Sequence, residues 1–224
     1  MGTKVNMAKS GGVRLLTADG APAEFNRTTS IDFLGHSFRL NQVSIKLAVE
    51  KKIKTRIQKL IYYNLIRAPK LGIQNPARLA RVDRDYATYI WQLRRYLYGD
   101  VSERSVRRFY RRGVPAKRFR GVMSFFPFVD CAEQLEKLDA WLISQTCLAM
   151  RRRAALLLAA GLPLPGPHGV TCARLAAYKH TSATTGGVLD LRLPSFQKMQ
   201  TLVARAARAY GPNRTARALK YSYE

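Results

Sequence analysis

Apolar residues recur at helical spacing along most of the chain and alternate with polar residues only near its start. Between residues 30 and 40, Ile31 and Phe33 alternate with Asp32, and Gly35 follows in a position typical of a turn. Strand residues two apart share one face, so this alternation predicts a short β-hairpin. From Ile45 onward the apolar spacing becomes three or four, which predicts helices. We therefore expect a mainly α fold with an N-terminal β-hairpin packed on a helical bundle.

The first predicted helix covers 46–66, and six further segments carry helical or connector signals. Its apolar stripe consists of Ile45, Val49, Ile53, Ile57, Leu60, Ile61 and Leu65. The later helices are expected over 77–97, from Ser102 to Gly113, over about 131–160, within 170–181, and from Ser195 to Tyr210. In the helix over 131–160, the core candidates are Leu135, Leu138, Trp141, Leu142, Leu148 and Leu156. The Pro/Gly-rich segment GLPLPGPHG is a connector. The chain thus divides into 1–45, 46–160, the connector 161–169, and a C-terminal helical segment, 170–224.

Positive charge dominates the chain and is concentrated in its helical part. The sequence holds 39 Lys and Arg against 14 Asp and Glu, a formal net charge of +25. Between Lys46 and Arg120 there are 21 basic and 5 acidic residues, interleaved with aromatic side chains. The densest stretch reads RSVRRFYRRGVPAKRFR, from Arg104 to Arg120. Surface ion pairs cannot neutralise such an excess, so a phosphate backbone is the expected partner. Each aromatic residue, taken singly, is expected to lie in the core.

Several other classes of function are disfavoured by the sequence. No apolar run is long enough to span a membrane, and no signal-peptide core is present, so no membrane partner and a cytoplasmic location are expected. The three cysteines are odd in number and widely spaced, which predicts free thiols in a reducing compartment. His36, His168 and His180 match no metal-ligand spacing. Asp83 and Asp85 are two apart within an expected helix and are interpreted as surface charges.

The segment from Ser30 to Phe38, SIDFLGHSF, resembles the FLG-x-x-F hairpin of bacterial reverse transcriptases of the intron, retron and defence-associated lineages. The preceding segment, NMAKS from Asn6 to Ser10, is similar to the LN-x-x-K-T/S segment of that family. The basic helix after the hairpin begins where the family's thumb begins. The segments YLYG, RGVMS and LDAWL, which start at Tyr96, Arg120 and Leu138, resemble the C-terminal helical region of defence-type members.

This resemblance implies that the hairpin is a primer grip at the end of the palm, and that the helices after it form a thumb. The chain would then be the C-terminal part of an RNA-directed DNA polymerase that binds template–primer, either RNA or an RNA–DNA duplex. The grip turn would be formed by Phe33, Leu34 and Gly35. We expect the phosphates to lie in one basic groove beside Gly35, contacted by Lys46, Lys51, Lys54, Arg56, Lys59, Arg107, Arg108, Arg111 and Arg112.

The family's catalytic Tyr-x-Asp-Asp loop does not occur in this sequence. Phosphoryl transfer by polymerases uses metal ions held by carboxylates, so the chain alone is expected to be inactive and to hold no cofactor. Mg²⁺ would be implied only for a complete parent polymerase. The family's motif order places the catalytic loop before residue 1, in a longer parent or in a palm and fingers subunit. A stand-alone basic helical RNA-binding or scaffold protein is the alternative interpretation, and an amphipathic protein on a membrane surface is a third.

Overall fold

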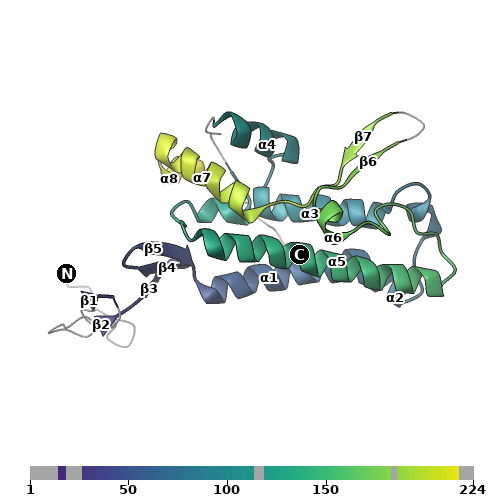
Figure 1. Ribbon diagram of the computed structural model, residues 1–224, viewed down its shortest axis with the longest axis horizontal. Coiled ribbons are helices and arrows are strands. Elements are labelled where there is room, and N and C mark those ends of the chain that lie inside the picture. Colours follow the sequence, from purple (N-terminus) through teal and green to yellow (C-terminus); the bar gives the residue numbers. More distant parts are fainter. Residues whose placement is uncertain (1–14, 19–26, 114–118, 183–185, 217–224) are drawn as a thin grey trace, which may run out of the picture.

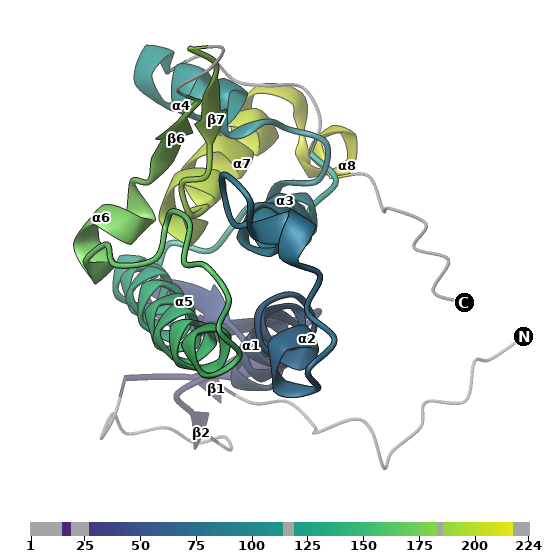
Figure 2. The same ribbon diagram turned by 90° about the vertical axis from the view of Figure 1, so that its right-hand side faces the viewer.

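The computed structural model describes residues 15–18, 27–113, 119–182 and 186–216. It confirms a mainly helical fold, whose long helices lie in three layers (Figures 1 and 2). The middle layer consists of α3 (Arg84–Tyr98) and α5 (Ala132–Ala159). On one side of this layer lies α1 (Leu47–Ile61). On the other side lie α4 (Glu103–Arg112) and α7 (Phe196–Tyr210).

The predicted hairpin is part of a three-stranded antiparallel sheet. Its strands are β3 (Ile31–Phe33), β4 (His36–Arg39) and β5 (Gln42–Ile45), in that order across the sheet. Leu34 and Gly35 connect β3 to β4 with φ angles of 45° and 85°. A two-residue turn with positive φ at both positions matches the right-handed twist of the strands it joins. Glycine tolerates this conformation, whereas leucine adopts it at an energetic cost.

The outer edge of β5 is held by the start of α5. The Asp130 carboxylate accepts a hydrogen bond from the Val43 N–H at 2.8 Å. The Gln134 side chain accepts from the Ile45 N–H at 2.7 Å and donates to the Ile45 carbonyl at 2.8 Å. These contacts fix the orientation of the sheet relative to the bundle, although 87 and 89 residues separate the partners in sequence.

The family-like segment from Asn6 to Ser10 lies outside the described residues. Of the chain before the three-stranded sheet, the structure describes a short parallel strand pair formed by β1 (Leu15–Leu16) and β2 (Arg27–Thr28).

The first predicted helix is confirmed, together with its buried stripe. Ile53, Ile57 and Ile61 of α1 are all buried, as their spacing predicted. After α1 the chain continues through one π-helical segment, η1 (Tyr62–Ile66), into α2 (Arg67–Lys70). Two consecutive tyrosines, Tyr62 and Tyr63, are exposed at this point.

The prediction of one continuous helix over 77–97 is wrong. The structure has a short 3₁₀ helix, η2 (Pro76–Leu79), and a separate α3 that begins at Arg84. Asp83 is the N-cap of α3, and its Oδ1 accepts from the N–H groups of Asp85 and Tyr86 at 3.0 and 3.2 Å. A residue that caps a helix has non-helical, extended backbone angles, so a continuous helix cannot pass through Asp83.

A close backbone approach follows the end of α3. Gly99 ends the helix with a φ of 75°. A Cβ built on Gly121 would lie 2.1 Å from the Leu97 carbonyl oxygen, and one built on Gly99 would lie 2.7 Å from the Gly121 nitrogen. Only glycine at both positions lets the segment before η3 (Val122–Phe125) pass this closely beneath α3.

The predicted helix signals at Ser102, Gly113 and Ser195 are confirmed. Ser102 caps α4 through its hydroxyl, which accepts from the Ser105 N–H, and Gly113 ends α4 in the left-handed region. Ser195 caps α7 in the same way. Leu148, predicted in the core of α5, is instead 54% exposed. The remaining elements are α6 (Cys172–Ala176), β6 (Lys179–Thr181), β7 (Val188–Asp190) and α8 (Pro212–Thr215).

One hydrophobic core joins the segments before and after the connector. It includes Ile57 of α1, Leu93 of α3, Leu142 of α5 and Phe196 of α7, each fully buried. The connector also pairs with the start of α3, since the Asp83 N–H donates to the Gly166 carbonyl at 3.0 Å. No helix among the described residues is both long and apolar enough to cross a membrane.

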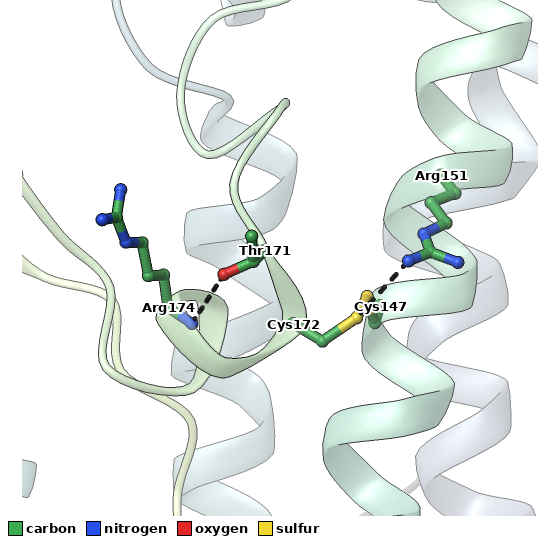
Figure 3. The surroundings of a disulfide bond; sticks show 5 residues. All are labelled: Cys147, Arg151, Thr171, Cys172 and Arg174. Carbon is green, nitrogen blue, oxygen red and sulfur yellow. Dashed lines mark hydrogen bonds between the residues drawn. A yellow bond between two sulfur atoms is a disulfide. The ribbon is translucent and has the colours of Figure 1, made fainter.

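A disulfide bond corrects the prediction of free cysteines. Cys147 of α5 and Cys172 of α6 are joined, with their Cα atoms 5.6 Å apart (Figure 3). Cys131 remains a free, buried thiol. The guanidinium of Arg151 donates to the sulfur of Cys172 across this bond at 3.8 Å. A disulfide is uncommon in a reducing compartment, so it does not fit the reasoning that led to a cytoplasmic location.

Candidate nucleic-acid interface

The tip of the hairpin projects side chains into solvent. Phe33 is 62% exposed and Leu34 is 81% exposed. The Gly35 carbonyl accepts from the Lys46 N–H at 2.9 Å, which joins the turn to the start of α1. A Cβ on Gly35 would meet Val49 and Phe126 only at ordinary contact distances of 3.6 and 3.7 Å. Backbone conformation, not lack of space, is therefore the reason for glycine here.

The basic side chains of α1 form a surface that starts at this turn. We call it the α1 surface, and it comprises Lys46, Lys51, Lys52, Lys54, Arg56 and Lys59. Lys51, Lys52 and Lys59 are exposed and line a shallow depression of about 420 Å³ on α1. Lys46 pairs with Asp32 of β3 at 3.3 Å, and Lys54 pairs with Glu50 at 2.5 Å. All five candidates that the sequence predicted on this helix thus lie along one element beside the hairpin.

Aromatic side chains continue the α1 surface beyond its last lysine. Tyr62 and Tyr63 are 42% and 58% exposed, with their rings 5.6 Å apart. The Arg67 guanidinium lies 5.7 Å from the centre of the Tyr63 ring. Basic groups that alternate with exposed rings are typical of surfaces that contact phosphates and stack on bases. Each tyrosine, taken singly, was expected in the core, but both lie between the buried residues Ile61 and Leu65 on the outward side of the predicted apolar stripe.

The arginines of α4 form a second, separate surface. This α4 surface comprises Arg104, Arg107, Arg108, Arg111 and Arg112. Arg107 pairs with Glu103 at 3.0 Å, and the Arg108 guanidinium lies 5.2 Å from the Phe109 ring. Both ribbon views place α4 beyond α3 and next to α7, on the opposite side of the bundle from α1 (Figures 1 and 2). The expectation that α1 and α4 line one groove beside Gly35 is therefore wrong.

The two aspartates predicted on the surface are buried. Asp83 is 0% exposed and Asp85 is 9% exposed. The Arg153 guanidinium, also fully buried, donates to both Asp83 oxygens at 2.6 and 3.1 Å and to Asp85 at 2.8 Å. It donates further to the Leu65 carbonyl of η1 at 2.8 Å. This network ties η1, α3 and α5 together, so the surface interpretation of Asp83 and Asp85 is wrong.

His168 of the connector completes the buried network. Its Nε2 lies 2.9 Å from an Asp83 oxygen. Burial alone would raise the pKa of Asp83, but hydrogen bonds from His168 and Arg153, together with the Arg153 charge, hold that pKa below its usual value. The chemistry of this site is structural, because a carboxylate so fully used by the protein has no free oxygen for a metal ion or substrate. Among the described residues, no group of three metal-ligating side chains is close enough to hold a metal ion.

The aromatic residues of α3 divide between core and surface. Tyr86, Tyr89 and Tyr98 are fully buried, as the core interpretation predicted. Burial raises the pKa of all three phenols. Trp91 of the same helix is instead 64% exposed. The buried tyrosines belong to the core, so they are not available to stack on a nucleic acid.

Comparisons with protein-family models, with curated proteins and with solved structures found no match for this chain.

Proposed function

We propose that the chain binds template–primer nucleic acid as the C-terminal, thumb-side part of an RNA-directed DNA polymerase of the reverse-transcriptase type. The hairpin tip would hold the primer strand, and the α1 surface would contact the phosphates of the duplex. Phosphoryl transfer would take place on palm and fingers elements outside this chain, which would supply the carboxylates and the Mg²⁺. In this proposal the chain positions nucleic acid and performs no chemistry itself.

One observation carries the proposal. An exposed turn with a left-handed glycine lies beside the start of a helix whose outward face is basic, and the two are joined by the hydrogen bond from the Lys46 N–H to the Gly35 carbonyl. The helix α1 carries five basic residues and one acidic residue. Basic side chains along a helix can contact successive phosphates and so position a duplex, which supports this proposal.

Binding measured across a range of salt concentrations tests the proposal. A protein that neutralises several phosphates loses affinity steeply with salt, with a slope of about 0.9 per contact on a duplex. We expect a primed RNA template to show this behaviour by fluorescence anisotropy. The triple variant Lys51→Glu/Lys52→Glu/Lys59→Glu should lower the slope by roughly 3, because each substitution removes about one contact.

A matched control separates specific contact from overall charge. The variant Arg108→Glu/Arg111→Glu/Arg112→Glu changes the net charge by the same amount on the α4 surface. If the template lies along α1, the α4 variant should retain most of the affinity. Equal losses in the two variants would mean that affinity follows net charge alone, and the proposal would then be abandoned. Primer extension by the chain alone should yield no product.

A stand-alone RNA-binding protein is the second candidate, and the α4 surface favours it. A cationic helix on the far side from the hairpin is not needed for one duplex beside Gly35. A stand-alone binder should show no preference for a primed template over the same RNA without primer. The first proposal predicts a clear preference for the primed template.

A further inference from the structure

A surface cavity beside the hairpin has no role in the interface described so far. It lies between the segment that leads into α5 and the C-terminal half of α7, and its volume is about 590 Å³. Sites for small organic ligands commonly measure about 300–1,000 Å³. We call it the Phe128 pocket. Its lining includes Phe128, Asp130, Gln200, Thr201, Arg205 and Arg208.

One wall of the pocket presents an aromatic ring to solvent. Phe128 is 57% exposed, although its neighbours Phe126 and Val129 are buried and anchor the loop on both sides. The Phe128 ring centre lies 6.5 Å from the ring centre of His36 in β4. An exposed ring on an anchored loop is a platform on which a base can stack. The contact with His36 places this platform next to the hairpin.

The facing wall is cationic. Arg205 and Arg208 lie three residues apart on α7 and therefore share one face. Arg205 donates to the Tyr110 carbonyl at 3.1 Å, and its guanidinium lies 5.7 Å from the Tyr110 ring, which orients it. Among the ion pairs of the described residues, none involves Arg205 or Arg208. Both guanidinium groups thus retain donors for an anion.

The other polar groups of the pocket are partly used within the protein. Asp130 is the one carboxylate of the lining, and it already accepts from the Val43 N–H. The Gln200 side chain donates to the Val129 carbonyl, and the Thr201 hydroxyl donates to the Gln197 carbonyl. The oxygens of Gln200 and Thr201 keep acceptor capacity for the N–H groups of a ligand. With two arginines and one aspartate, the pocket favours an anion that also carries a flat polar ring.

We propose that the Phe128 pocket binds one nucleotide unit of single-stranded nucleic acid. The base stacks on Phe128, and the adjoining phosphate is held by Arg205 and Arg208. A paired base cannot enter a pocket of this kind while it remains in its duplex, so the site selects unpaired strand. The inference rests on the proposed function and deepens it, because it adds a subsite for an unpaired strand beside the hairpin.

Binding of an eight-nucleotide single strand, compared with a blunt duplex, tests this inference by fluorescence anisotropy. Phe128→Ala should weaken single-strand binding roughly tenfold, since stacking on one base accounts for a loss of that order. Phe128→Tyr keeps a ring and should restore the affinity. The matched control is Phe125→Ala, because Phe125 is similarly exposed at 48% but does not line the pocket.

A second pair of variants tests the phosphate contact. Arg208→Ala should lower the salt slope for the single strand by about 0.7, the value for one phosphate contact on a single strand. Arg214→Ala removes an exposed arginine from α8, outside the pocket, and should leave the slope unchanged.

The outcomes separate this inference from the proposed function. Equal single-strand affinities in Phe128→Ala and Phe125→Ala would overturn the inference, even if duplex binding still depended on the α1 surface. Free uridine monophosphate can be added as a competitor of the labelled strand. If it competed as effectively as an unlabelled strand at the same nucleotide concentration, the assignment to a strand would be overturned. If the unmodified protein showed no salt-dependent duplex binding, the proposed function would be refuted. The comparison of Phe128→Ala with Phe125→Ala would still decide whether the pocket binds a single strand.

Discussion

Removal of Arg153 should destabilise this protein more than the loss of any arginine on its surface. The Arg153 side chain is fully buried and makes hydrogen bonds to Asp83, Asp85, Gln74 and the Leu65 carbonyl. In Arg153→Ala, the Asp83 carboxylate would stay buried with its main counter-charge removed. Loss of one partner from a buried ion pair costs about 3–5 kcal/mol. The free energy of unfolding of a typical domain is about 5–15 kcal/mol, so this loss is a large fraction of it.

Urea unfolding followed by circular dichroism measures the effect. With a urea m-value of about 2–3 kcal/mol/M, the unfolding midpoint should fall by roughly 1–2.5 M. The neighbouring Arg152 is exposed and is the matched control, because surface substitutions usually change stability by less than about 0.5 kcal/mol. Equal midpoints for Arg153→Ala and Arg152→Ala would refute the assignment of a buried network.

A double substitution separates the ion pair from simple packing. Asp83→Asn keeps an N-cap for α3, because asparagine caps helices as well as aspartate does. Asp83→Asn combined with Arg153→Met removes both charges, and paired removal of buried charges is often nearly neutral. We therefore expect the double variant to be more stable than the sum of the single losses predicts. Additive losses would show that the two side chains do not act as a pair.

The same network predicts a dependence of stability on acid. The folded-state pKa of Asp83 lies below its unfolded value of about 3.8. The ionised carboxylate therefore contributes stability that is fully present above the unfolded pKa and is lost as the pH falls through the folded pKa. Asp83→Asn should show a shallower fall in the free energy of unfolding below about pH 4 than the unmodified protein. A steeper fall would contradict the direction of the pKa shift.

Two further predictions concern the disulfide and the hairpin. Cys147→Ser opens a crosslink between residues 25 apart, which should cost roughly 3.5 kcal/mol in the chain-entropy estimate. Dithiothreitol should lower the urea midpoint of the unmodified protein but not that of the variant; equal sensitivity would argue against the bond. Gly35→Ala should strain the turn by about 1–2 kcal/mol and weaken duplex binding, whereas Gly35→Asn should be tolerated. If Gly35→Ala left the duplex affinity unchanged, the turn would have no role in duplex binding.

The sequence predicted those helices whose signals are local. The apolar spacing of Ile53, Ile57 and Ile61 and the serine caps at Ser102 and Ser195 depend on residues within one or two turns. Such patterns can be recognised without knowledge of the rest of the fold. The turn at Gly35 was predicted for the same reason.

Features that depend on distant partners were not predictable from local patterns. Asp83 resembles a surface charge until Arg153, 70 residues away, is brought to it. Cys147 and Cys172 match no disulfide pattern in sequence, and only the packing of α6 on α5 joins them. No local pattern predicts the Phe128 pocket, because its aromatic and cationic walls lie on two segments far apart in the chain.

The separation of the two basic surfaces also depends on tertiary structure. In the sequence, the arginines of α4 and the lysines of α1 both lie in segments with the pattern of an amphipathic helix. Which side of the bundle each helix occupies is decided by the packing of α4 on α7. Net charge predicted a polyanionic partner, but it could not predict that the arginines of α4 lie on the opposite side of the bundle from α1.

The crossing beneath the end of α3 limits how this chain can diverge. At Gly121 even one methyl group would collide with a main-chain oxygen of Leu97, and main chain cannot move aside as a flexible side chain can. Distant relatives that keep this crossing should therefore retain a pair of glycines spaced 22 positions apart, Gly99 and Gly121 here, while most of their surface changes. A search for this glycine spacing, combined with the preceding Asp-x-Asp motif of Asp83 and Asp85, could identify such relatives even where overall sequence identity is low.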